Sequence, residues 1–283
     1  MAKVGIATDT IACLSSETIE EYGIGIVPVL MTLNGKEYRD RVDISPDEFW
    51  NIYPEIQDYS TAAPPAIEFI KAFEELSQTT DSIACTFVSK ALSATFEAAL
   101  QARNMFQKDH PKVKIEVVDS RNAAGAQGFV VLEMAKAARE GKTLEQVVEI
   151  ANNMVPKVRY ITALEGLKRL IKIGRAPKTA YIGELFQVKP LIGMVNNTGV
   201  VENLGKARGT EKTMQKMLEM MDVYIDRDKP LNITIHYTTS IEEGQKLKEM
   251  VTEKYNVVES FFTPYSPVIC LAIGPAISVA FYQ

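Results

Sequence analysis

The sequence predicts an α/β fold with a parallel sheet in its first half and a smaller mixed α/β arrangement in its second half. Short apolar runs alternate with longer helical patterns up to about residue 157, which is typical of a parallel sheet covered by helices on both faces. Beyond that point a hairpin signal, Asn196-Asn197-Thr198-Gly199, interrupts the alternation. Because 283 residues are enough for two domains, we expect an N-terminal domain at 1–157 and a C-terminal domain at 158–283.

The elements of the first half follow from local signals. Asn34-Gly35 is a turn pair typical of a hairpin, and Ser45-Pro46 opens a helix with a cap and an N1 proline. Thr143 and Gln146 form a capping box. The expected elements are a strand at 3–9, a helix at 16–22, an extended run at 24–33, a helix from 45, an extended loop at 60–65, a helix at 66–76, a strand from 83, a helix from 92, a strand at 115–119, and helices at 124–140 and 144–153.

The second half combines extended runs with fewer helices. We expect an extended run at 158–164, a short helix at 165–170, a basic turn at 172–178, hairpin strands at 189–195 and 200–204, a helix at 210–224, a strand at 231–237, a helix at 241–255 and three extended runs in the last thirty or so residues. His236 falls in the middle of a predicted strand. We interpret it as a core or edge residue rather than a catalytic base.

Composition excludes several classes of function. With 31 basic and 36 acidic residues the net charge is −5, whereas a general nucleic-acid binder would present a strongly basic face. No apolar run reaches the length of a membrane span, and the N-terminus leads into a strand rather than a signal peptide. The widely spaced Cys13, Cys85 and Cys270 indicate buried thiols in a reducing cytoplasm. The two histidines are too few for a histidine-rich metal site, so no metal or cofactor is expected.

A polar turn lies between the predicted strand from 83 and the helix that follows it. Its hydroxyls, Ser89 and Ser93, precede a helix N-terminus, where free N–H groups and the helix dipole attract phosphate or carboxylate. Asp9 and Asp119 end neighbouring predicted strands, and ligands of parallel sheets bind beyond such carboxyl ends. An ordinary helix cap at Ser89 or Ser93 is the alternative, and the turn alone favours it.

A set of short motifs follows in order along nearly the whole chain. They are Thr8-Asp9-Thr10, Gly35-Lys36-Glu37-Tyr38-Arg39-Asp40, Val42-Asp43-Ile44-Ser45, Thr61 before Pro64, Leu92-Ser93-Ala94-Thr95-Phe96, Val118-Asp119-Ser120, Ile173-Gly174-Arg175, Lys189-Pro190, Gly274-Pro275 and Ala280-Phe281-Tyr282. In this order and spacing they resemble the DegV family of bacterial fatty-acid-binding proteins, which includes the acyl-binding subunits of bacterial fatty acid kinase.

The resemblance implies a three-layer α/β/α domain with a parallel sheet and a two-layer domain with a mixed sheet. It implies a long-chain fatty acid whose carboxylate is bound at the domain junction by residues that match Thr61 and Ser93. The protein would carry out no catalysis itself but would present the carboxylate to a separate ATP-using kinase. The family's arginines match Arg175 and Arg208, whose implied role is contact with the kinase or its phosphate.

Two positions depart from the family pattern. Ala272 stands where the family has a histidine in the carboxylate network, and Ala94 stands where it has a glycine. A hydrogen bond to a charged group contributes roughly 1.5–3 kcal/mol. The loss of one is therefore expected to weaken or redirect carboxylate capture.

Small residues on two predicted helices are candidates for the wall of an acyl tunnel. The tunnel residues we expect are Ala91, Ala94, Phe96, Ala98, Ala124, Gly125 and Gly128. Burying a methylene contributes about 0.8 kcal/mol, so a chain of about sixteen carbons supplies roughly 12 kcal/mol. The alternative is that these small residues only allow tight packing of helix on sheet. The sequence leaves both open.

Two other functions compete with fatty acid presentation. One is an enzyme that acts on a phosphorylated or carboxylated metabolite, with Asp9 and Asp119 as acid or base. The other, prompted by Ala272, is a carrier that stores or senses a lipid without coupling to a kinase.

Overall fold

The structure is a computed structural model that describes residues 4–177 and 188–283. Its N-terminal half is built on a four-stranded sheet of order β2-β1-β6-β7, in which all neighbours run parallel. The strands are β1 (Gly5–Asp9), β2 (Gly25–Val27), β6 (Ser82–Phe87) and β7 (Lys114–Asp119). The predicted parallel sheet is therefore confirmed. Lys3 and Lys178, each at the end of a predicted segment, lie outside the described residues.

Helices cover both faces of this sheet, which gives the three layers. On one face lie α3 (Ala66–Ser77) and α4 (Thr95–Asp109), and on the other lie α1 (Ser16–Tyr22), α5 (Ala124–Arg139) and α6 (Leu144–Met154). Several helix ends follow the expected caps. Thr143 and Gln146 form the capping box of α6, and Gly23 ends α1 in the left-handed conformation that glycine adopts without strain.

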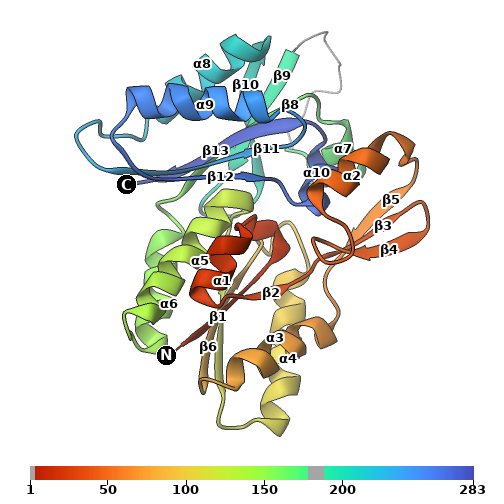
Figure 1. The fold of residues 1–283 in the computed structure, drawn as a ribbon, viewed down its shortest axis with the longest axis vertical. Helices are drawn as coiled ribbons and strands as arrows, with labels where there is room; N and C mark the ends of the chain where they lie inside the picture. The colour runs from red at the N-terminus through yellow and green to blue at the C-terminus, as the bar shows by residue number, and fades with distance from the viewer. Residues whose placement is uncertain (1–3, 178–187) are drawn as a thin grey trace.

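A separate three-stranded antiparallel sheet of order β4-β3-β5 projects from the first half, at the right of Figure 1. Its strands are β3 (Leu30–Leu33), β4 (Lys36–Arg39) and β5 (Tyr59–Ala62), with α2 (Pro46–Ile52) and the 3₁₀ turn η2 (Tyr53–Glu55) between β4 and β5. Asn34 and Gly35 both have positive φ, which a tight hairpin requires.

Two expectations fail at this small sheet. The extended run at 24–33 is not one strand, because it divides at Pro28 into β2 of the parallel sheet and β3 of the small sheet. The segment 60–65 is not a loop throughout, since β5 pairs along β3 with Thr61 opposite Met31. The prolines at 64 and 65 follow that strand and do not interrupt its pairing.

The C-terminal half is built on a six-stranded mixed sheet of order β10-β9-β8-β13-β11-β12. Only β11 and β12 pair in parallel. The elements are β8 (Arg159–Leu164), α7 (Lys168–Lys172), β9 (Val188–Met194), β10 (Val201–Arg208), α8 (Thr210–Met221), β11 (Leu231–Tyr237), α9 (Ile241–Lys254), β12 (Val257–Pro264), α10 (Pro267–Ile273) and β13 (Ala276–Tyr282). The prediction of three extended runs near the C-terminus is thus wrong for the second of them, because Pro267 starts the helix α10 there.

Helix α5 lies between the two large sheets, as Figure 1 shows in its centre. It contacts β1 and β6 on one side and β8, β11 and β13 on the other, while α8 and α9 cover the opposite face of the second sheet. Thirteen of its sixteen residues are buried, which explains why it is apolar most of the way round. Residue 157 falls between α6 and β8; the division into domains there stays a prediction.

Two further observations concern the class of protein. Across residues 4–177 and 188–283, no helix combines the length and apolarity needed to cross a membrane. Cys13, Cys85 and Cys270 are buried free thiols, as the sequence indicates.

The tight packing of α5 makes a first prediction. Alanine normally favours a helix over glycine by about 1 kcal/mol. A Cβ at Gly125, however, would collide with Thr234 Cγ2 and lie 2.6 Å from His236 Nε2. We expect Gly125→Ala to lower the free energy of unfolding by about 1–3 kcal/mol, as overpacking does, measured by chemical denaturation.

Gly166→Ala is the matched control, since a Cβ there meets no atom within 4 Å. Its effect on the free energy of unfolding should stay below about 1 kcal/mol. Equal stability of the two variants would show that α5 is not tightly confined at Gly125.

Candidate functional site

A cavity opens where the carboxyl ends of the parallel strands face the second half of the chain. Its volume is about 280 Å³, close to the lower end of the roughly 300–1,000 Å³ of typical ligand pockets. It is lined by Ile11, Val29, Thr61, Ala62, Ala63, Val88, Leu92, Ser93, Ala94, Ala123, Ala124, Tyr160, Thr162, Leu170, Ile173, Arg175, Ile192, Gly193, Met194, Val201, Val268, Ile269, Ala272 and Ile273. Most of these side chains are apolar, so the cavity suits a hydrophobic ligand.

Cavity-lining residues follow every strand of the parallel sheet. Ile11 follows β1, Val29 follows β2, Val88 follows β6 and Ala123 follows β7. The opposite wall comes from β8, β9, α7 and α10. The site therefore lies beyond the carboxyl ends of the strands, where ligands of such sheets bind.

The structure brings several of the expected site residues into this one cavity. Thr61, Ser93 and Arg175 all line it, although they come from β5, the turn before α4 and the segment after α7. Ala94 and Ala124 line it as well, and so does Ala272 on α10.

Ser93 is half-buried at the start of α4. Its Oγ accepts a hydrogen bond from Thr95 N at 3.2 Å and lies 2.8 Å from Thr95 Oγ1. Ser89 has a different role, because its Oγ donates to Gly199 O at 2.8 Å and links this turn to the β9–β10 hairpin. The N-cap position of α4 is Ala94, which has no side-chain oxygen to cap the helix. Neither serine therefore occupies the N-cap position.

Two helices begin at the cavity wall with an N-cap residue that makes no side-chain hydrogen bond, although Ser93 Oγ accepts from Thr95 N of α4. Their N-cap residues are Ala94 for α4 and Ala123 for α5, and both line the cavity. The first backbone N–H groups of a helix have no partner within the helix, and the dipole makes that end positive. This wall of the cavity is therefore suited to a carboxylate or phosphate.

Thr61 and Arg175 lie at the exposed part of the cavity. Thr61 pairs with Met31 through its backbone. Arg175 Nε donates to Leu92 O at 2.7 Å, and its Nη1 donates to Ile173 O at 2.7 Å. Arg175 thus ties the segment after α7 to the turn that carries Ser93.

Five of the residues expected in the acyl tunnel do not line this cavity. Ala91 is exposed. The ring of Phe96 lies beside Lys90, with 5.8 Å between the ring centre and Lys90 Nζ. Ala98 packs against the core between α3, α4 and the parallel sheet. Gly125 and Gly128 instead line a separate, small pocket of about 20 Å³ between α5, the start of α1, and strands β11 and β12.

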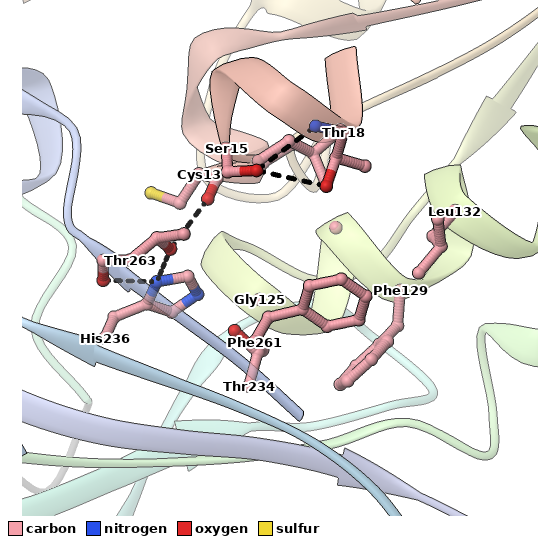
Figure 2. A pocket seen from close by; sticks show the side chains of 13 residues that line it. Cys13, Ser15, Thr18, Gly125, Phe129, Leu132, Thr234, His236, Phe261 and Thr263 are labelled. Atoms are coloured by element: carbon pink, nitrogen blue, oxygen red, sulfur yellow. Dashed lines mark hydrogen bonds between the residues drawn. The ribbon is translucent and has the colours of Figure 1, made fainter. Parts of the chain in front are cut away.

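Figure 2 shows this second pocket, with Gly125 and Phe129 of α5 beside Thr234 and His236 of β11. A Cβ at Gly128 would lie 2.7 Å from Ala12 O. The packing alternative thus accounts for both glycines. His236 is a buried core residue whose Nδ1 lies 2.9 Å from Thr263 Oγ1, and burial lowers its pKa to about 4.

Arg208 also lies outside the cavity. It is an exposed residue at the end of β10. Val201, at the other end of that strand, lines the cavity. At about 3.3 Å per residue, the two positions are roughly 23 Å apart along the strand.

The acidic residues at the strand ends build the turns rather than the cavity surface. Asp9 is fully buried and accepts hydrogen bonds from Ile11 N, Val88 N and Gln127 Nε2. Burial raises the pKa of its carboxyl to about 6. Asp119 accepts from Lys90 N and Arg121 N. Neither carboxyl lines the cavity, which argues against the enzyme alternative that uses them.

The sequence assigned no role to Asp40, which holds one wall of the cavity. Its Oδ1 accepts from Val268 N at 3.1 Å, in the first turn of α10. Asp40 is fully buried, and this burial raises the pKa of its carboxyl to about 6. The only sequence signal for Asp40 was its position at the end of the motif Gly35-Lys36-Glu37-Tyr38-Arg39-Asp40.

A pair of hydrogen-bonded tyrosines, also missed, lies at the cavity wall formed by β8. The hydroxyls of Tyr160 and Tyr265 lie 2.6 Å apart, and Tyr265 Oη lies 3.3 Å from Thr162 Oγ1. Tyr160 and Thr162 line the cavity from β8. For the part of the chain that the structure describes, no cluster of three or more His, Cys, Asp or Glu side chains is arranged to hold a metal ion.

Comparison with known proteins identifies relatives along the whole chain. The family model described as an uncharacterised protein of the DegV family matches residues 3–283. A DegV domain-containing protein from Caldanaerobacter subterraneus is 32% identical over 222 residues, which are 78% of this chain and 77% of the relative. One from Staphylococcus aureus is 30% identical over 275 residues, 97% of this chain and 96% of the relative.

Solved structures share the fold. A DegV family protein from Thermus thermophilus, described as fatty acid binding, has a TM-score of 0.90 at 24% identity, with both chains fully covered. A stearic acid-binding protein from Eubacterium ventriosum has a TM-score of 0.89 at 23% identity and covers 100% of this chain and 98% of its own. The expected fold, three layers followed by a sheet of mixed direction, is thereby confirmed.

The buried carboxyl of Asp40 predicts a pH dependence of stability. Its pKa is about 6 in the folded protein against 3.8 for an ordinary aspartate, so the folded state holds a proton that the unfolded state has lost between these values. The contribution of Asp40 to stability therefore falls as the pH rises from about 4 to 6 and beyond. Relative to the parent, Asp40→Asn should gain stability over this range, measured by denaturation at several pH values.

Asn51→Gln is the control, because Asn51 is exposed on α2 and neither side chain titrates. Its difference from the parent should stay constant over the same range. A constant difference for Asp40→Asn as well would contradict the raised pKa.

Proposed function

The chain belongs to the DegV family, and on that premise we propose that it binds one long-chain fatty acid. The carboxylate is held by Thr61 and Ser93, and the acyl chain lies in the apolar cavity. The observation that carries this proposal is the placement of both hydroxyls and two helix N-termini on the wall of one apolar cavity.

The apolar lining of the cavity supports an acyl chain. Solved relatives of the same fold from Thermus thermophilus and Eubacterium ventriosum bind fatty acids. At about 0.8 kcal/mol per methylene, burial of a chain of about sixteen carbons supplies roughly 12 kcal/mol before the costs of binding. Apolar burial therefore supplies most of the affinity, and the head group sets the orientation.

The carboxylate needs hydrogen bonds once it leaves water. Ser93 and Thr61 offer hydroxyl donors, and the starts of α4 and α5 offer backbone N–H groups. Hydrogen bonds to an ionised group are the strong ones. This set of donors neutralises a carboxylate in part while leaving it exposed enough for a partner to reach.

We also propose a protein partner for this chain and a location in the cell. The chain itself carries out no chemistry; it presents the carboxylate to a separate ATP-dependent fatty acid kinase, with Arg175 and Arg208 as contacts. Arg175 is exposed at the cavity and Arg208 is exposed on β10, so both are accessible to a docked protein. The proposed location is the cytoplasm, where buried free thiols such as Cys13 stay reduced.

A lipid store or sensor without kinase coupling is the second candidate. Ala272 favours it, because this residue lines the cavity and its methyl group can neither donate nor accept a hydrogen bond. A carboxylate with one fewer partner is held in a less defined orientation, which affects transfer of phosphate more than binding.

Ligand release from the purified protein tests the binding proposal. After denaturation, mass spectrometry should detect a long-chain fatty acid. Loss of one hydrogen bond to a charged group costs roughly 1.5–3 kcal/mol, so Ser93→Ala and Thr61→Val should each weaken oleic acid binding by roughly 10- to 100-fold.

Ser60→Ala is the matched control, because Ser60 precedes Thr61 and lies on the opposite face of β5. Its affinity for oleic acid should equal that of the parent. A protein that releases no fatty acid and takes up no oleic acid would sink the proposal.

Kinase coupling is tested separately. With a purified bacterial fatty acid kinase, ATP and the loaded protein, we expect acyl-phosphate to form. Arg208→Ala should lower its rate of formation and leave the affinity for oleic acid unchanged, since Arg208 lies outside the cavity. Normal binding without any acyl-phosphate would instead favour the store or sensor.

A further inference from the structure

Thr61 and Ser93 are carried by two different sheets. Thr61 lies on β5 of the three-stranded sheet, and Ser93 lies in the turn between β6 and α4 of the parallel sheet. Among the described strands, no pairing joins these two sheets. The separation of the two hydroxyls therefore depends on contacts made by a further element.

That element is α7 together with the three residues that follow it. On one side Arg175 Nε donates to Leu92 O, directly before Ser93 in the chain. On the other side Arg169 and Lys172 lie over the ring of Tyr59. The Cζ of Arg169 is 4.9 Å from the ring centre, and the Nζ of Lys172 is 3.9 Å from it. Both distances are within the range of cation–π attraction.

Tyr59 transmits this contact to Thr61. The two residues are two positions apart on β5 and pair with Leu33 and Met31 of β3, so their side chains share one face of the sheet. Leu33 and Met31 are buried, which identifies this face as the inner one. A shift of Tyr59 therefore moves Thr61 with it.

Arg169 is itself anchored to the cavity wall. Its Nη1 donates to Leu271 O at 3.3 Å, and its Cζ lies 4.4 Å from the ring centre of Tyr53. Leu271 directly precedes Ala272 near the C-terminal end of α10, where a positive charge is favourable. Arg169 thus holds β5, η2 and α10 together at one point.

From these contacts we infer that Arg169 and Lys172 are positioning residues, which act through Tyr59 to hold Thr61 across the cavity from Ser93. The inference rests on the proposed function, since it concerns retention of the fatty acid carboxylate. Neither cation lines the cavity, so their effect on the ligand passes through β5.

Release of a fluorescent fatty acid tests this inference. The full-length protein is loaded with cis-parinaric acid and mixed with excess oleic acid, and the decay of fluorescence gives the dissociation rate. Tyr59→Leu removes the ring that both cations contact and should speed release about tenfold, as loss of two such contacts implies. Tyr59→Phe keeps the ring and should release at the parent rate.

Two further measurements separate positioning from a general loss of stability. If Tyr59 acts through Thr61, the effects of Tyr59→Leu and Thr61→Val should not add in the double variant. The double variant Arg169→Leu, Lys172→Leu leaves β5 intact and should also speed release, whereas Lys168→Met, an exposed residue of the same helix, should not.

The outcomes are distinct. Failure of the parent to bind either fatty acid would overturn the proposed function and this inference with it. Normal binding with parent-like release from Tyr59→Leu and from the double cation variant would overturn the inference alone. Fully additive effects of Tyr59→Leu and Thr61→Val would do the same.

Discussion

The packing of α5 between two sheets is the constraint on which the rest of the structure depends. A helix that contacts a sheet on each side must be apolar nearly all round. It must also carry small residues where its neighbours approach most closely. Thirteen of its sixteen residues are buried, and Gly125 and Gly128 lie at the closest contacts. Because α5 starts at the carboxyl ends of the parallel strands, the second sheet is held opposite those ends. The cavity is the space left between them.

Buried carboxylates, rather than apolar contacts alone, fix the walls of that cavity. Asp9 holds the backbone of Val88, and Asp40 holds the backbone of Val268. Both acceptors are fully buried, and burial raises the pKa of each to about 6. Hydrogen bonds of this kind are directional, so they define where each wall segment lies while the side chains that face the ligand remain apolar.

The sequence predicts the local structure well wherever a capping or turn signal is present. Thr143 with Gln146 and the Asn34-Gly35 turn illustrate this. The prediction from sequence fails where pairing with another strand decides the local structure. An example is β5, which is a strand only because β3 lies beside it. The same holds at the site. The motif resemblance selects Thr61, Ser93 and Arg175, which meet in one cavity. The stripe of small residues on α5 could not be assigned from sequence, because small side chains serve a tunnel and a tight helix contact equally well.

Because the head-group site is assembled from separate segments of the chain, the affinity for the lipid and the orientation of its carboxylate depend on different contacts. The acyl chain gains its binding energy from apolar walls that belong to both halves, and this gain is insensitive to small shifts. The carboxylate depends on hydrogen bonds, which weaken steeply when their geometry is lost. With Ala272 in the cavity wall, fewer hydrogen-bonding groups set the position of the carboxylate. Each remaining group therefore has a larger effect on that position. The placement of Thr61 by β5 therefore bears on how the carboxylate is presented as well as on how firmly the lipid is held.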